Sequence, residues 1–257
     1  MARSFASATD KIIQGTVAAP VTGSLSLWLY PNWAWNDTVD HYIFDVSLDA
    51  SNVFQLRKFS FDNNFYCGWY TADIDYRVTT AASDLVQSAW NHLCLTWDDT
   101  ANETKLFLAG SQIGSTVVTL VTFTSTSNRV LGNDSLIGLT NLDGRLGEYA
   151  VWDAVLNLNE IVGLSRGQSP WRVRNGSLTD YLRLDGLVSP EPNMKAGRTE
   201  GTVTGATLAN HAPVPPFSRL FWGASPVIEA AAAAGGGFKP YYDRGSTMLG
   251  LGARRRM

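Results

Sequence analysis

The segment at residues 90–110 limits the fold more strongly than any other part of this sequence. Leu93, Leu95 and Trp97 alternate with less hydrophobic residues, which is the two-residue period of a strand with one buried face. Residues 98–102 (Asp-Asp-Thr-Ala-Asn) then favour a turn, and a second apolar segment ends at Gly110. The sequence therefore predicts a β-hairpin here, with a tryptophan near each end of its first strand.

Further strands are predicted wherever apolar, aromatic or β-branched residues recur between turn-forming residues. They are 4–14 (a short edge strand with a polar turn), 24–30, 41–48, 53–61, 65–70, 75–79, 117–123, 128–138 (with a Gly-Asn-Asp turn inside it), 143–153, 180–186 and 201–207. In 41–48 the alternation places Tyr42, Phe44, Val46 and Leu48 on the inner face. One short helix is predicted at 158–166, because Asn157 and Glu160 form a capping box and Gly167 follows.

Short motifs spread over most of the chain resemble those of laminin-G-like, concanavalin A-like domains. They are the opening segment 4–13, the strand 24–31, the Trp-x-His hairpin at 90–110, the segment 143–153 and the strand 180–186. Gly147 stands where the family usually has an aspartate, while Glu148 keeps the usual glutamate. The resemblance implies an all-β fold: a two-sheet antiparallel jelly-roll sandwich with one short helix and an extended C-terminal arm. It implies no activity, because one fold carries many functions.

Composition divides the chain into three parts. Residues 1–187 contain the predicted laminin-G-like sandwich. Six prolines between positions 190 and 226 predict that residues 188–229 form an extended segment that wraps the sandwich. Residues 230–257 begin with five alanines and three glycines, which predict a linker, and end in a basic, aromatic tail.

The overall composition narrows the class of protein. A formal net charge of −3 argues against a nucleic-acid-binding domain. The two cysteines, Cys67 and Cys94, are expected to be reduced core thiols, with a disulfide as the alternative. Residues 1–10 lack the apolar core of a secretory signal, and no apolar segment approaches the roughly 20 residues of a membrane helix. We therefore expect synthesis in the cytoplasm and no membrane partner.

The sequence contains no recognisable catalytic arrangement, so the protein is predicted not to be an enzyme. Glycosidases place two carboxylates across a sugar, but Glu148 has no partner carboxylate on its strand. His41, His92 and His211 form no motif, and His92 is expected to be a structural histidine. A glycoside hydrolase with a carboxylate pair from distant segments is the weakest alternative.

The candidate glycan-binding residues are aromatic. Flat sugar faces stack on such rings, which makes a binding platform of Trp33, Trp35, Trp69 and Tyr70 one interpretation. The alternative is that these rings are buried in the core or at a subunit contact. Packing is the favoured interpretation of the two.

Metal binding is left open. The resemblance implies a calcium ion at the rim of the sandwich, held by the hard oxygen ligands that this ion prefers. The candidate ligands are Asp98, Asp99, Asp134 and Asp143, together with Asn102 and Asn133. Turn formation explains each of these residues without a metal, so no cofactor is predicted.

The tail from residue 238 to residue 257 carries five basic residues against one acidic residue. Aromatic residues and arginine are the usual anchors of protein interfaces, so the tail is predicted to contact a partner. The candidate contacts are Phe238, Lys239, Tyr241, Tyr242, Arg254, Arg255 and Arg256. Contact with nucleic-acid phosphates and a solvated chain end are the alternatives.

Two classes of function remain: a carbohydrate-binding or adhesion module, and a structural assembly protein. In its opening residues and proline-rich segment the chain resembles stand-alone proteins of tailed phages. The favoured hypothesis is a virion protein that decorates a capsid or tail. Such a protein would contact other virion proteins, or copies of itself, through its C-terminal arm, and could also contact host glycan.

Overall fold

The computed structural model describes residues 1–16, 21–72, 74–118, 128–136, 140, 142–186 and 189–214. All of them belong to one compact unit, Met1–Phe217. The tail at 230–257, with every candidate assembly contact, lies outside the described residues.

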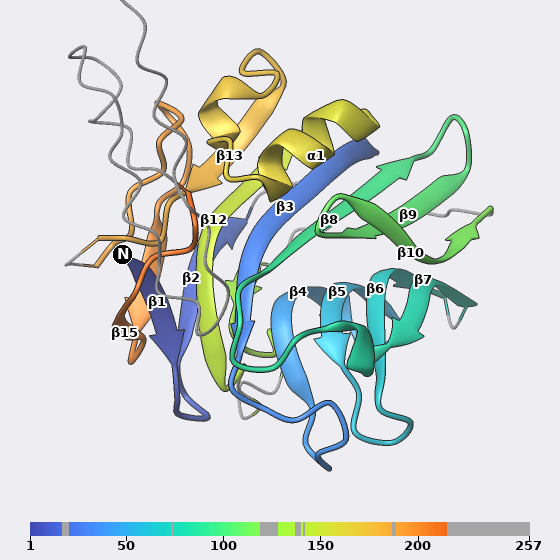
Figure 1. Cartoon of the computed structure of the whole chain (residues 1–257), viewed down its shortest axis with the longest axis horizontal. Coiled ribbons are helices and arrows are strands. Elements are labelled where there is room, and N and C mark those ends of the chain that lie inside the picture. Colours follow the sequence, from blue (N-terminus) through green and yellow to red (C-terminus); the bar gives the residue numbers. More distant parts are fainter. Residues whose placement is uncertain are drawn as a thin grey trace, which may run out of the picture. The chain divides into compact units, whose positions relative to one another are not determined.

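Two antiparallel sheets form this unit (Figure 1), which confirms the predicted all-β sandwich. The eight-stranded sheet has the order β10 (Ser111–Val117), β9 (Glu103–Leu108), β8 (Asn91–Asp98), β3 (Thr22–Pro31), β12 (Gly144–Trp152), β1 (Ala2–Phe5) and β15 (Thr207–Ala209), and β13 (Leu178–Leu182) also pairs with β12. The seven-stranded sheet has the order β14 (Gly201–Thr204), β2 (Lys11–Thr16), β11 (Asn128–Leu131), β4 (His41–Asp49), β5 (Asn52–Lys58), β6 (Asn64–Thr71) and β7 (Ile74–Ala81).

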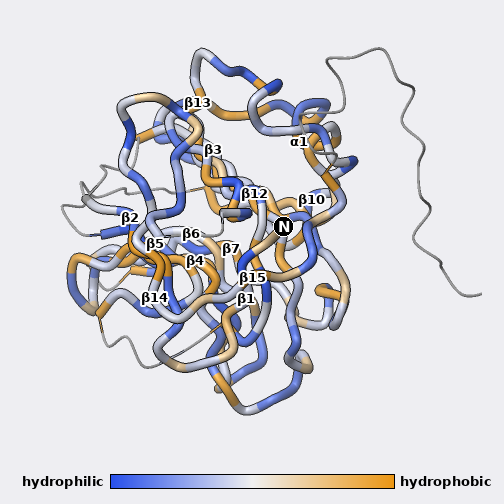
Figure 2. The backbone as a smooth tube through the Cα atoms, turned by 90° about the vertical axis from the view of Figure 1, so that its left-hand side faces the viewer, coloured by the Kyte–Doolittle hydropathy of each residue, from blue (hydrophilic) through white to orange (hydrophobic). Residues whose placement is uncertain are grey.

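The main core lies between the two sheets, because each sheet turns one apolar face toward the other. Figure 2 shows hydrophobic segments along the strands and hydrophilic segments mainly in the outer loops. Among the largest fully buried side chains are Trp69, Trp97, Tyr149, Phe44 and Phe65. Burial of one large apolar side chain stabilises a fold by roughly 1.5–3 kcal/mol, so this cluster dominates the stability of the sandwich.

The predicted hairpin is β8–β9. Leu95 pairs with Leu106 across the two strands, and both side chains lie in the core. In the turn, Asp98 Oδ1 accepts hydrogen bonds from the backbone N–H groups of Thr100 (3.0 Å) and Ala101 (3.3 Å). The hairpin predicted at 90–110 is therefore confirmed, with its alternating residues in the core and its aspartate in the turn.

A bulge in β4 corrects the inner face predicted for this strand. Tyr42 pairs with Arg57 of β5, and the pairing skips Ile43 before it resumes at Phe44. One extra residue reverses the direction of the side chains on one side of a bulge. Phe44 therefore points into the core, whereas Tyr42 lines a pocket elsewhere. Leu48, which the pairing skips at a second shift of the register between Ser47 and Asp49, is 45% exposed.

Residues after 189 complete both sheets. β14 pairs with β2 at the edge of one sheet, and β15 pairs with β1 at the edge of the other. The sandwich therefore extends past the predicted boundary at 187, and β14 occupies the start of the strand predicted at 201–207.

Two buried ion pairs fasten this C-terminal segment. Arg3 Nη2 lies 2.8 Å from Glu191 Oε2. Arg129 Nη1 lies 2.9 Å from Oδ2 of Asp180, which is fully buried in β13. Asn193 donates to the other oxygen of Asp180 (2.9 Å) and so joins the segment to the second pair.

The predicted helix is confirmed as α1 (Leu158–Ser165). Asn157 accepts from the backbone N–H of Glu160, whose carboxylate accepts from the backbone N–H of Asn157. Gly167, with φ +88°, ends it. The apolar face of α1 packs on the outer face of the eight-stranded sheet, against Cys94 and Trp152. Two 3₁₀ turns, Ala82–Asp84 and Pro170–Arg172, complete the helical elements of the described chain, in which no helix has the length and apolarity to span a bilayer.

The two cysteines are free and buried at different places. Cys67 lies in the core between the sheets, whereas Cys94 lies beneath α1. Burial raises the pKa of both thiols, because the thiolate is poorly solvated there. The prediction of reduced core thiols is therefore confirmed over the disulfide.

His92 is a structural histidine, as predicted. Its side chain is 1% exposed, its Nε2 lies 2.9 Å from Ser26 Oγ, and its ring packs edge-on against Trp28. Burial lowers the pKa of His92 to about 3, because the imidazolium form would lose its hydration.

This pKa predicts a loss of stability in acid. The pKa of His92 in the folded protein lies below its value of about 6.5 in the unfolded chain. The free energy of unfolding is therefore highest, as far as His92 is concerned, above pH 6.5. It falls by up to about 1.4 kcal/mol per pH unit as the pH decreases toward 3. We expect the wild type to lose about 2 kcal/mol more than a His92→Gln variant between pH 7 and pH 5. Urea unfolding at both pH values measures this, and equal losses would show that His92 titrates normally.

Candidate functional site

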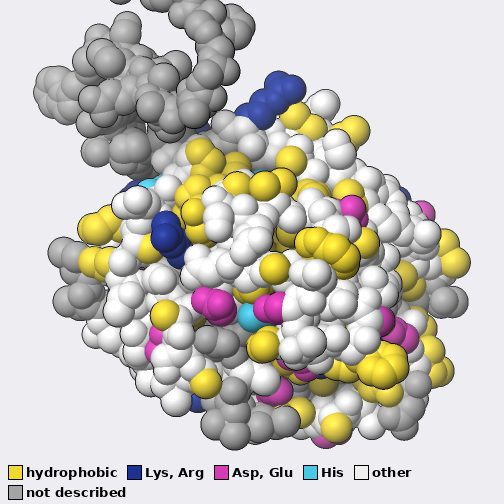
Figure 3. Space-filling model, turned by 60° about the horizontal axis from the view of Figure 1, so that its bottom comes forward, with side chains coloured by type: hydrophobic (Ala, Val, Ile, Leu, Met, Phe, Trp, Pro, Cys, Tyr) yellow, Lys and Arg dark blue, Asp and Glu magenta, His cyan; other side chains and the backbone are white. Residues whose placement is uncertain are grey.

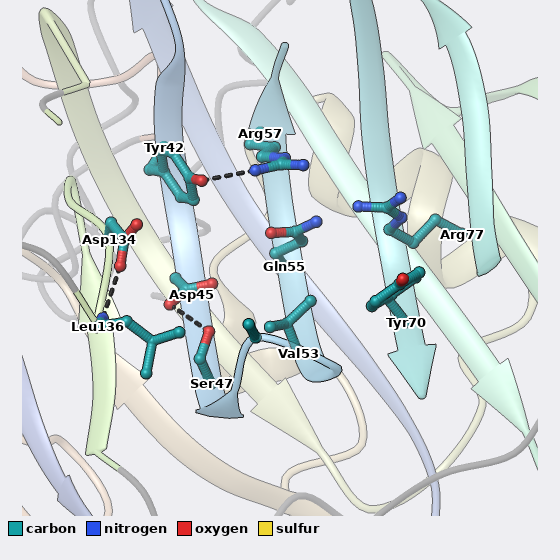
Figure 4. A pocket seen from close by; sticks show the side chains of 11 residues that line it. Tyr42, Asp45, Ser47, Val53, Gln55, Arg57, Tyr70, Arg77, Asp134 and Leu136 are labelled. Carbon is teal, nitrogen blue, oxygen red and sulfur yellow. Dashed lines mark hydrogen bonds between the residues drawn. The ribbon is translucent and has the colours of Figure 1, made fainter. Parts of the chain in front are cut away.

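A pocket of about 390 Å³ lies on the outer face of the seven-stranded sheet (Figure 4). Four cross-strand partners form one row on this face: Asp45 of β4, Gln55 of β5, Gly68 of β6 and Arg77 of β7. Because Gly68 has no side chain, this row has a gap between the glutamine and the arginine. The pocket walls also include Tyr42, Ser47, Val53, Arg57, Tyr70 and Asp134.

Asp45 is held in one orientation at the floor of the pocket. Its Oδ2 accepts hydrogen bonds from Ser47 Oγ (2.9 Å), from the Ser135 backbone N–H (2.9 Å) and from Ser135 Oγ. Burial raises the pKa of Asp45, although the hydrogen bonds from Ser135 and Ser47 oppose the shift. These bonds leave Oδ1 as the oxygen available to the pocket.

The two arginines of the pocket have different partners. Arg77 makes a two-point ion pair with Asp75, with both N–O distances 2.7 Å, and lies over the rings of Tyr66 and Tyr70. Arg57 instead donates from Nη1 to Tyr42 Oη (2.5 Å) and also lies over the Tyr42 ring, 5.4 Å from its centroid. The aromatic rings therefore fix both guanidinium groups by cation–π contacts.

Three buried polar atoms of the pocket residues have no hydrogen-bond partner in the described part of the protein. They are Asp45 Oδ1, Gln55 Nε2 and Arg57 Nε. Such atoms cost roughly 1–3 kcal/mol each when they stay unpaired, so they are uncommon in native proteins. The residues that line the pocket thus contain one unpaired acceptor and two unpaired donors.

The structure separates the four candidate glycan-binding residues. Trp69 is fully buried and stacks on Phe54 in the core, with ring centroids 4.2 Å apart. Trp33 is 4% exposed and stacks on His41. Neither ring can contact a sugar, so these two residues are not part of a platform, and packing, the favoured interpretation, holds for both. Tyr70 lines the pocket, and Trp35 is 50% exposed outside it.

The loop that carries Trp35 is tied to the seven-stranded sheet. Lys58, whose side chain is buried, contacts Asp37 and donates to the carbonyl of Val39 (3.0 Å). Asp37 Oδ2 in turn lies 2.7 Å from His41 Nε2. On the face of the molecule shown in Figure 3, acidic side chains lie on either side of a histidine near the centre, and hydrophobic side chains are scattered around them.

The candidate calcium ligands are dispersed. Asp98 organises the β8–β9 turn, Asp99 is exposed there, and Asp143 accepts from Asn32 Nδ2 (3.2 Å). Asp134 lines the pocket, and its Oδ1 accepts from the backbone N–H of Leu136 (2.5 Å). Nowhere in the described ranges do three acidic, histidine or cysteine side chains gather as a metal site would require.

Glu148 has partners that the sequence did not indicate. It occupies a bulge of β12 with φ +54°, its carboxylate accepts from Tyr181 Oη, and its Oε1 lies 3.1 Å from His211 Nε2. His41 and His92 lie elsewhere, so the three histidines are not a cluster. The contact between Glu148 and His211 joins the C-terminal segment to β12, and Glu148 itself is buried, at 2% exposed.

Sequence reasoning missed most of the pocket. Asp45, Gln55, Arg57 and Arg77 occupy the polar positions of three alternating strands, and that alternation was the available signal. The turns between β4, β5, β6 and β7 favour pairing of these consecutive strands, but the alternation did not show which face of the resulting sheet carries a pocket.

The fold and the pocket together define a jelly-roll sandwich protein with a small polar pocket on one sheet. More specifically, the chain belongs to the concanavalin A-like lectin/glucanases superfamily, whose laminin-G model matches residues 8–162. None of the curated proteins matches this sequence.

Solved structures share the fold at low sequence identity. A Bacteroides ovatus protein whose proposed role is carbohydrate binding has a TM-score of 0.61 and 17% identity, over 83% of this chain and 61% of that one. A heptameric SAP-like pentraxin from Limulus polyphemus has a TM-score of 0.52 and 13% identity, over 79% of this chain and 95% of its own. The present chain thus spans less than two thirds of the Bacteroides protein, and at these identities the likeness concerns the fold alone.

Proposed function

We propose that this protein is a non-enzymatic carbohydrate-binding module and that the pocket on the seven-stranded sheet is its binding site. The observation that carries the proposal is the set of unpaired buried polar atoms of Asp45, Gln55 and Arg57 beside the ring of Tyr70. Saccharides match such a site, because their hydroxyl groups both donate and accept while their C–H faces pack on rings. The volume of about 390 Å³ is within the range of small-ligand sites.

Binding without hydrolysis fits the state of the two carboxylates. Asp45 Oδ2 is occupied by Ser47 and Ser135, and Asp134 accepts from the backbone of its own loop. A glycosidase needs one carboxylate as a general acid and a second as a nucleophile or base. Release of reducing sugar from a bound saccharide would contradict this part of the proposal.

The ring of Tyr70 supplies a test of the site. Tyr70→Ala should weaken saccharide binding about tenfold, or about 1.4 kcal/mol, because the pocket loses its aromatic wall. A glycan array identifies the saccharide, and titration calorimetry then gives Kd for each variant.

Trp35→Ala is the matched control, since Trp35 is a half-exposed ring outside the pocket. Its Kd should equal that of the wild type. Loss of binding in Trp35→Ala with full binding in Tyr70→Ala would move the site to the loop and refute the proposal.

A virion structural role is the second candidate function. It is supported by the basic, aromatic composition of residues 238–257 and by the resemblance to proteins of tailed phages, and it is compatible with a glycan pocket. Its test is mass spectrometry of purified particles from the source of the sequence. Absence of the chain from every such particle would refute it.

A further inference from the structure

Asp45 and Gln55 present opposite hydrogen-bonding groups to the pocket. They are direct cross-strand partners on β4 and β5, and Figure 4 shows their side chains next to each other on the pocket floor. Their side chains are almost wholly buried, at 1% and 2% exposed. Asp45 Oδ1 and Gln55 Nε2 nevertheless lack a partner, so the two side chains do not satisfy each other.

The acceptor of this pair is fixed before any ligand arrives. Ser47 and Ser135 occupy Asp45 Oδ2 and so set the plane of the carboxylate, which leaves Oδ1 in place. A group held in this way loses little conformational entropy on binding. Such pre-organisation is typical of a binding site, and the same hydrogen bonds also hold the loop at Ser135 against β4.

The charges around the pair disfavour an anionic ligand. The pocket and its immediate partners hold two guanidinium groups, Arg57 and Arg77, against the three carboxyl groups of Asp45, Asp75 and Asp134. Arg77 is already neutralised by Asp75, and Asp45 and Asp134 lie at the opposite side of the pocket. An acidic sugar would meet two carboxyl groups there.

We propose that the pocket binds a neutral saccharide through two adjacent hydroxyl groups, one of which donates to Asp45 Oδ1 while the other accepts from Gln55 Nε2. This inference rests on the proposed function and adds the class of ligand and the residues that select it. Adjacent hydroxyls suit the pair, because each can donate or accept and because their oxygens are held close together on a pyranose ring. Arg57 Nε is a third donor for a ring or hydroxyl oxygen of the same saccharide.

The proposal is tested on the full-length chain with three groups of saccharide on one array. The first group contains neutral hexosides, the second contains the same hexosides methylated at single hydroxyls, and the third contains saccharides that end in a uronate or sialate. Neutral hexosides should bind, and methylation of either hydroxyl of one adjacent pair should abolish the signal.

Gln55→Glu tests the pair from the protein side. The substitution replaces the donor with an acceptor and places a carboxylate opposite Asp45, so Kd for the neutral saccharide should rise at least tenfold. Gln55→Met, which removes the donor without adding charge, should raise Kd to a similar extent. It keeps the test valid if Gln55→Glu does not fold. Gln112→Glu, on the exposed face of β10, is the matched control and should keep the wild-type Kd.

The possible results distinguish failure of this inference from failure of the proposed carbohydrate-binding function. Binding of a neutral saccharide that Gln55→Glu and Gln55→Met leave intact, while Tyr70→Ala weakens it, overturns the inference and keeps the pocket. Preference for acidic saccharides, lost in Arg57→Met, also overturns the inference alone. Absence of any saccharide binding to the folded wild type overturns the proposed function as well.

Discussion

Replacement of Trp69 by alanine should lower the free energy of unfolding by about 3–5 kcal/mol, which is the range for deletion of a large buried aromatic side chain. Trp69 is fully buried, stacks on Phe54 and packs edge-on against Trp97, so the two sheets would enclose a cavity. Chemical denaturation followed by circular dichroism measures the change.

Tyr70→Ala is the control for this prediction, because the two residues are neighbours on β6 but point to opposite faces. Tyr70→Ala should cost less than about 1.5 kcal/mol of stability while it weakens binding, since its ring is only partly buried. The reverse ranking of the two stabilities would show that Trp69, and not Tyr70, faces the solvent.

The Asp180→Ala variant should be destabilised by about 3–5 kcal/mol, because removal of one partner leaves an uncompensated buried charge. The carboxylate of Asp180 is fully buried, and it accepts from Arg129 (2.9 Å) and Gln14 (2.7 Å) as well as Asn193. Urea denaturation of the variant gives the change in the free energy of unfolding.

Asp99→Ala is the matched control, since it removes an exposed aspartate in the β8–β9 turn and should change stability by less than about 0.5 kcal/mol. Because Asp180 anchors Asn193, limited proteolysis should also cut Asp180→Ala faster than the wild type within 189–200. Equal stability of Asp180→Ala and the wild type would contradict the proposed role of the ion pair.

Local patterns predicted most elements of this fold, because strands and caps depend on near neighbours in sequence. They did not separate β1 from β2 within 4–14, and they missed β10. The alternation at 93–97 and the Asn157–Glu160 capping box both act in the structure as their chemistry indicates. The prediction for β4 was wrong at Tyr42, since a bulge leaves no mark in the alternation of one strand. The same bulge turns Tyr42 toward the pocket.

The candidate platform shows a second limit. Trp69 and Tyr70 are adjacent aromatic residues, and composition gives no reason to separate them. Their environments differ because one face of the seven-stranded sheet packs against the other sheet, so that Trp69 lies in the core while Tyr70 lines the pocket. The alternation of β6 predicts that they face opposite ways, but only the sheet shows which one is buried.

The sequence by itself determined that this protein consists of β-strands with one capped helix, because alternation, turn residues and caps are local properties of the chain. Its resemblance to laminin-G-like domains indicated the sandwich. Tertiary structure decided where a ligand could bind. Asp45, Gln55 and Arg77 are separated by ten residues or more in sequence and form one row only when β4 to β7 pair in their observed register. The turns help to set the pairing of these consecutive strands, but which face of the sheet is buried, and therefore which face carries the pocket, depends on the packing of the two sheets against each other.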